Sequence, residues 1–186
     1  MLGIPLEMVH HWWRVLLVYL AGVVAGSLAT SVSDPSIYLA GASGGVYAVM
    51  AAHVATIIMV IIFLHQAIAA SEFIVLIFFF ILQNWKEMKF AIVQLAIFLI
   101  LAVTDIGTAV YNRYILKDEN DQVGYVAHLA GAIAGLLVGI NVLRNLEVRS
   151  WENKIWWAAL TLYTVLMLAA IIWNAAFPNY FPQQYV

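Results

Sequence analysis

The sequence predicts an all-α fold, a polytopic transmembrane helical bundle, on three observations. The chain of 186 residues is 65% hydrophobic and 10% charged, whereas soluble domains are about 45–50% apolar and about 25% charged. Apolar runs of about 20 residues, enough to cross a bilayer as a helix, recur along the whole chain. These runs lack the alternation typical of barrel strands, and in hydrocarbon only a helix satisfies its own backbone amides. We therefore expect a single membrane domain over residues 1–186, surrounded by a lipid bilayer.

Each helix is expected where an apolar run is bounded by charged or turn residues. Such runs lie at approximately 15–33, 42–64, 67–83, 90–112, 124–143 and 155–177. The turn at residues 33–36 separates the first two runs, because Pro35 fixes φ and Asp34 can bond its own backbone. Tryptophans near the ends of the runs are typical of interfacial anchors: Trp12, Trp13, Trp85, Trp151, Trp156, Trp157 and Trp173.

Charge and composition exclude several classes of function. The formal net charge is -2 and the cations are scattered between apolar runs, so no basic surface is expected for a nucleic acid. The absence of cysteine excludes disulfides and thiolate chemistry. No metal or other cofactor is expected, because only two of the five histidines are close in sequence and no carboxylate joins that pair; the five are His10, His11, His53, His65 and His128.

A serine lies where a loop is expected to enter a helix, in the sequence Gly41-Ala42-Ser43-Gly44-Gly45-Val46-Tyr47. The first amides of a helix have no partner within the helix, so they can stabilise an oxyanion beside Ser43. The same small residues would also allow two membrane helices to pack closely. Taken alone, the motif therefore fits either a nucleophile or a packing surface.

A histidine begins a second motif, in which Gly131, Gly135 and Gly139 repeat every four residues. The repeat forms one smooth stripe along a helix and permits close approach of another helix. His128 lies three residues before Gly131 and so near the same stripe, facing a protein neighbour. An ionisable group inside a membrane span is costly, which makes His128 a functional candidate, with a structural hydrogen bond as the alternative.

Together the two motifs resemble the signature of rhomboid intramembrane serine proteases, and flanking stretches such as residues 3–7 and 18–22 resemble the animal secretase-type members. The resemblance covers most of the chain except residues 60–83. It implies that Ser43 is the nucleophile, that His128 is the general base and then the acid, and that Tyr47 packs on the histidine ring. The same motifs assign supporting positions to four glycines, which are Gly41, Gly44, Gly131 and Gly135.

A third group normally orients the base in serine hydrolases, but no acid lies near His128 in the sequence. The rhomboid resemblance implies that none is needed, since ring packing on Tyr47 takes that part. Asp105 lies within an apolar run and is expected to be buried, so it needs a partner or water. A structural hydrogen bond and an orienting or gating role both remain open for Asp105.

The chain departs from the family pattern in two places. The first two family helices, including a His and an Asn thought to bind the oxyanion, are expected before Gly3 and are not in the sequence, so about five family helices are present. Residues 60–83 form an apolar insertion that the pattern does not call for. If this segment does not span the membrane, most loop cations fall on one side, and Ser43 and His128 begin their helices at the same face.

The predicted function is that of a serine endopeptidase that cleaves single-pass membrane proteins through a Ser43 acyl-enzyme. By family resemblance its substrates include growth-factor precursors, and its location is the secretory pathway or the plasma membrane. The alternative is a non-catalytic rhomboid-like protein that binds client transmembrane helices. A transporter is disfavoured, because the intramembrane charges are too few to outline an ion path.

Residues 60–83 also give the first testable prediction. Val60 has a codon that begins with GT and Gln83 can be encoded by CAG, so we hypothesise that the segment is an in-frame retained intron. Sequencing transcripts across Met59 to Asn84 is expected to show a major mRNA without it. A major mRNA that contains the segment would exclude the hypothesis.

Overall fold

The computed structural model confirms the all-α bundle and describes residues 4–33, 35, 42–69, 91–111, 115–116, 125–143, 150–177 and 180. The described helices are α1 (Ile4–His10), α2 (Trp12–Ser33), α3 (Ala42–Ala69), α5 (Ala91–Tyr111), α6 (Tyr125–Val142) and α7 (Ser150–Ala176). No strand occurs in this part of the chain. His11 separates α1 from α2 and has a φ of 68°, which is the left-handed region that a helix interior excludes.

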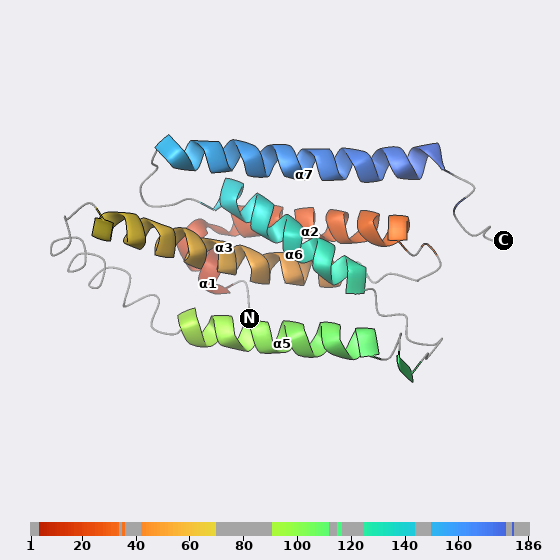
Figure 1. The fold of residues 1–186 in the computed structure, drawn as a ribbon, viewed down its shortest axis with the longest axis horizontal. Helices are drawn as coiled ribbons and strands as arrows, with labels where there is room; N and C mark the ends of the chain where they lie inside the picture. The colour runs from red at the N-terminus through yellow and green to blue at the C-terminus, as the bar shows by residue number, and fades with distance from the viewer. Residues whose placement is uncertain are drawn as a thin grey trace.

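Helices α2, α3 and α6 form the centre of the bundle, with α7 on one side and α5 on the other (Figure 1). Their directions follow from which residues meet. Gly131, Gly135 and Gly139 of α6 approach Gly44, Ala48 and Ala52 of α3 in the same order, so α3 and α6 are parallel. Gly22 and Gly26 of α2 approach Ala48 and Gly44 in the reverse order, so α2 runs antiparallel to both.

The three central backbones approach closely because glycines stand at their crossing. A Cβ atom added at Gly131 would overlap the carbonyl oxygen of Gly44, and one added at Gly135 would overlap that of Ala48. On the other side, a Cβ atom at Gly44 would lie 2.8 Å from the carbonyl oxygen of Gly22. Small residues at such contacts are the usual means by which helices associate in membranes, where no hydrophobic effect acts between them. No larger side chain fits at this crossing.

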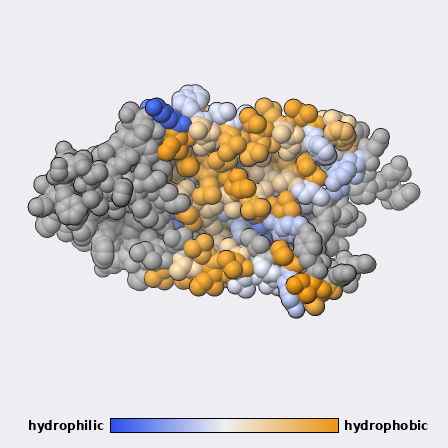
Figure 2. Space-filling model, viewed as in Figure 1, coloured by the Kyte–Doolittle hydropathy of each residue, from blue (hydrophilic) through white to orange (hydrophobic). Residues whose placement is uncertain are grey.

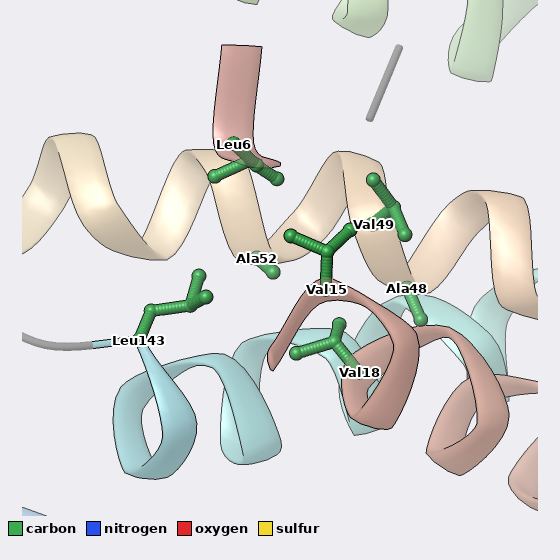
Figure 3. Packing of buried hydrophobic residues seen from close by; sticks show 7 residues of the cluster. All are labelled: Leu6, Val15, Val18, Ala48, Val49, Ala52 and Leu143. Atoms are coloured by element: carbon green, nitrogen blue, oxygen red, sulfur yellow. The ribbon is translucent and has the colours of Figure 1, made fainter. Parts of the chain in front are cut away.

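A compact apolar cluster adjoins this crossing and includes Leu6 of α1 (Figure 3). It consists of Leu6, Val15, Val18, Ala48, Val49, Ala52 and Leu143, contributed by α1, α2, α3 and the end of α6. Val18 is 1% exposed and Ala52 is completely buried. Because Leu6 reaches this cluster, the short helix α1 is fixed against the bundle.

The outer helices complete the bundle in different ways. Helix α7 is tied to the centre by polar contacts at both ends: Trp156 Nε1 donates to the carbonyl oxygen of Asn141 at 3.1 Å, and Ser31 of α2 hydrogen bonds to Asn174. Helix α5 contacts α3 and α6 more sparsely. Gly107 of α5 faces open space, with no atom within 4 Å of an added Cβ.

The face of the molecule in Figure 2 is apolar over most of its described area. Large hydrophobic side chains on α5 and α7, such as Val103 at 70% and Ile172 at 62%, are strongly exposed. In the described part of the chain, three segments are long and apolar enough to cross a membrane: Trp12–Ser33, Tyr125–Val142 and Asn153–Ala176. An apolar exterior around a glycine-lined interior is the arrangement expected of a bundle with lipid as its solvent.

Helices α2, α5, α6 and α7 agree with apolar runs of the sequence to within about five residues, whereas α1 was not expected and α3 is longer than its run. Helix α3 continues without interruption to Ala69, so the first ten residues of the apolar insertion at 60–83 belong to the same helix as Ser43. The remainder of that insertion lies outside the described residues. Several of the expected interfacial tryptophans are exposed, including Trp12 at 66% and Trp157 at 63%.

The structure buries His10 to 4% exposure. Burial, and then the positive charge of Arg14, lowers the pKa of His10 to about 4, so this imidazole is neutral at physiological pH. Within the described residues, no group of three or more His, Asp or Glu side chains is arranged to hold a metal ion.

The glycine crossing predicts opposite effects for the same substitution on two helices. Gly135→Ala would place a methyl group against the backbone of Ala48 and is expected to lower the free energy of unfolding by about 1–3 kcal/mol through overpacking. The methyl group of Gly107→Ala would contact no other atom, and this variant is expected to raise the free energy of unfolding by about 0.5–1 kcal/mol through helix propensity. Thermal unfolding in detergent micelles measures both. Equal melting temperatures for the two variants would contradict the described crossing.

Candidate active site

Ser43 is the second residue of α3 and is partly buried. The two glycines after Ser43 carry no side chain, so the neighbouring helices can approach this first turn closely. The amides of this first turn have no acceptor within the helix. Amides without an acceptor at a helix start can donate to a negative charge that develops nearby. Gly41 lies outside the described residues.

His128 lies in the first turn of α6 and is 6% exposed. The Tyr47 ring is stacked on it, with ring centroids 4.5 Å apart and an interplanar angle of 10°. Tyr47 is four residues after Ser43, so both side chains are on the same face of α3. That face is turned toward the start of α6, and the stack restricts how the imidazole ring can rotate.

The starts of α3 and α6 meet at the glycine crossing. Gly44, directly after Ser43, approaches Gly131 of α6, and the carbonyl of Ala127, directly before His128, lies near Gly44 and Gly26. The structure thus brings Ser43 and His128 to the same end of two parallel helices. Among the described residues no hydrogen bond joins these two side chains; hydrogen bonds of this kind are often long in the absence of a substrate.

An acid joins this group from α5. Asp105 Oδ2 accepts a hydrogen bond from the Tyr47 hydroxyl at 2.6 Å and lies 3.1 Å from Nδ1 of His128. The distance between Asp105 Oδ2 and His128 Nδ1 is short enough for an ion pair. The contact is not a hydrogen bond, since buried Nδ1 has no partner in hydrogen-bond geometry. The Asp105 side chain is 49% exposed in the bundle, so the expectation that it is buried was wrong.

Sequence reasoning named Asp105 but did not place it beside His128. The two residues are 23 positions apart on different helices, so no local spacing connects them. The signal that was available is chemical: Asp105 is the one carboxylate in the run from Ala91 to Tyr111. A charged group in an otherwise apolar span needs a polar partner inside the protein.

Comparison with known proteins finds relatives over most of the chain. The model of the rhomboid domain family matches the chain in two parts, residues 1–83 and 67–145. Rhomboid-related protein 3 of Mus musculus and that of Homo sapiens are each 39% identical over 178 residues, which is 94% of this chain and 38% of each relative. Rhomboid-related protein 2 of Mus musculus is 37% identical over 175 residues, 93% of this chain and 50% of the relative. No solved structure matches the chain.

The apolar helices and the glycine-lined core define an integral membrane protein of the helical bundle class. Within that class, the chain belongs to the rhomboid family. It spans between about two fifths and one half of the length of these relatives. A more distant match, named inactive rhomboid-related protein 2, from Caenorhabditis elegans, is 29% identical over 161 residues. Family membership alone therefore does not decide whether the chain is catalytic.

The crossing beside Ser43 predicts that Gly131→Val damages the site without touching its side chains. A Cβ atom there would overlap the backbone of Gly44, so α6 and His128 must move away from α3. Misplacement by about 1 Å can cost roughly 10²-fold in rate. The measurement is release of a membrane-anchored reporter, normalised to the amount of protein in the membrane. Wild-type release by Gly131→Val at equal abundance would contradict the packing argument.

Proposed function

We propose that the chain carries the catalytic dyad of an intramembrane serine endopeptidase, with Ser43 as nucleophile and His128 as general base. The observation that supports it most directly is the stacking of Tyr47 on His128 at the end of α6 that meets the Ser43 end of α3. A packing role for Ser43 would not require an ionisable, ring-oriented imidazole at the same crossing. Burying an ionisable group in a membrane protein costs free energy, so a histidine in that position is a functional candidate.

The chemistry follows from ordinary acyl transfer. His128 removes the proton of Ser43 as the hydroxyl attacks a peptide carbonyl, because a neutral serine is a poor nucleophile without a base. Amides in the first turn of α3 stabilise the resulting oxyanion. His128 then protonates the departing amine, and a water molecule, activated by the same ring, hydrolyses the ester on Ser43.

The proposed substrates are single-pass membrane proteins, growth-factor precursors among them, in the secretory pathway or at the plasma membrane. A substrate helix must unwind locally before Ser43 can reach its carbonyl, because helical amides are already hydrogen-bonded. Water must also reach this end of the bundle. The partial exposure of Ser43 and the half exposure of Asp105 are consistent with access at the α5 side.

A second candidate function is that of a non-catalytic protein that binds client transmembrane helices. The observation that favours it is the 29% identity to a relative named inactive. Retention of both Ser43 and His128, together with the Tyr47 stack, favours the protease. A fluorophosphonate probe separates the two functions, since it labels a serine only where a base activates the hydroxyl. Labelling of the wild type but not of Ser43→Ala is the result expected of the protease.

Reporter cleavage gives an independent prediction for the pair. Ser43→Ala and His128→Ala are each expected to abolish release of a single-pass reporter, and the double variant is expected to be scarcely worse than either. Non-additivity is the property of residues that act as one unit. The control is protein abundance, which a purely structural His128 would lower together with activity. A Ser43→Ala protein at normal abundance that still releases the reporter would exclude the proposed mechanism.

A further inference from the structure

We propose that Asp105 is a positioning residue that holds His128 in the tautomer and orientation required of the base. This inference rests on the proposed function and deepens it, because it adds a third polar group to the dyad. It departs from the expectation, drawn from the family resemblance, that packing on Tyr47 alone orients the ring. Three contacts support it: Tyr47 contacts Asp105, Asp105 contacts His128, and the His128 ring stacks on Tyr47.

The three residues come from three helices and form a closed triangle. Tyr47 of α3 donates its hydroxyl to Asp105 Oδ2 at 2.6 Å, which fixes where the carboxylate lies. The Tyr47 ring covers one face of His128, which fixes the plane of the imidazole. The fixed carboxylate oxygen is then 3.1 Å from Nδ1. Alignment of Nδ1–H with that oxygen would turn this contact into a hydrogen bond.

The tautomer of His128 follows from which of its neighbours can donate hydrogen bonds and which can only accept them. An ionised carboxylate only accepts hydrogen bonds, so the ring nitrogen that faces Asp105 is favoured in its protonated form. In a neutral imidazole with the proton on Nδ1, Nε2 has a free lone pair. That is the nitrogen required to take a proton from Ser43. Nδ1 is buried and has no other partner in hydrogen-bond geometry among the described residues, so Asp105 is the group that can select this form.

The membrane setting makes a chance contact costly. Helix α5 carries no other charged residue, and it exposes large apolar side chains such as Val103 and Val110. A carboxylate on such a helix is unfavourable unless polar groups within the protein compensate it. The Tyr47 hydroxyl and the His128 ring are the polar groups that the structure places against it. The same two partners belong to the candidate site, which argues that Asp105 serves the site.

The test compares the fluorophosphonate labelling rate of membrane-embedded variants, divided by the amount of protein present. Asp105→Asn retains the size and an acceptor for Tyr47 but removes the charge, and we expect labelling to slow by roughly 10-fold to 10²-fold. Asp105→Glu restores a carboxylate and is expected to recover most of the rate. Thr104→Val is the matched control on α5, since the Thr104 hydroxyl bonds only within its own helix, to the carbonyl of Ile100, and it is expected to label as the wild type does.

A spectroscopic readout separates positioning from folding. Solid-state ¹⁵N NMR of histidine-labelled protein, with His128 assigned by its loss in His128→Ala, is expected to show the Nδ1–H tautomer in the wild type and a changed tautomer ratio in Asp105→Asn. Equal labelling and an unchanged tautomer in Asp105→Asn would overturn the proposal. If Asp105→Asn does not accumulate in the membrane, Tyr47→Phe is the second test, because it removes the hydroxyl that holds Asp105 and keeps the stacked ring. An unchanged labelling rate in Tyr47→Phe would also overturn the proposal.

Failure of the proposed function is distinguishable from failure of this inference. A wild-type protein that the probe does not label, although it is folded, argues against the protease. The tautomer of His128 can still be measured in that protein, and its response to Asp105→Asn then decides whether Asp105 positions the ring. Labelling of the wild type with no effect of Asp105→Asn leaves the dyad in place and removes only the third group.

Discussion

The close approach of three helix backbones at Gly44 is the constraint on which the rest of the structure depends. Gly131 of α6 and Gly22 of α2 approach Gly44 from different sides, and a Cβ atom at either position would overlap a neighbouring residue. In lipid, apolar side chains gain little by leaving their surroundings, so helices associate where close packing brings many atoms into contact. Glycine permits that packing because it lacks a side chain. The direction and register of the central helices follow from this contact.

The same crossing decides where the polar residues of the site can be. Ser43 immediately precedes Gly44, and His128 comes three residues before Gly131, so fixing the two glycines fixes both helix starts. The helical repeat then carries Tyr47 to the face occupied by Ser43, where its ring meets His128. Helix starts also supply unpaired amides. A packing contact thus places Ser43, His128 and the first-turn amides of α3 at one end of the bundle, without long side chains to hold them.

The sequence predicted the fold class and most helix limits, because apolar runs in a membrane protein are bounded by bilayer thickness. The glycine spacing after His128 predicted which surface of α6 faces a neighbour, and the structure shows that neighbour to be α3. The burial of His10 could not be predicted, since it depends on how α1 folds against the bundle after the left-handed turn at His11. Nor could spacing place Asp105 beside His128, because that contact depends on how α5 is set against α3 and α6.

The contrast between α5 and the central helices gives one polar residue on α5 a large effect on how that helix is oriented. Gly107 faces open space, and the helix packs sparsely on α3 and α6. Apolar contact with lipid is equally favourable for many rotations of such a helix, so it gives α5 no preferred orientation. A carboxylate does give a preference, because only one orientation brings Asp105 to the Tyr47 hydroxyl. The orientation of α5 and the orientation of the His128 ring are then set by the same oxygen atom. Any movement of α5 away from the bundle therefore separates Asp105 from Nδ1 of His128 as well.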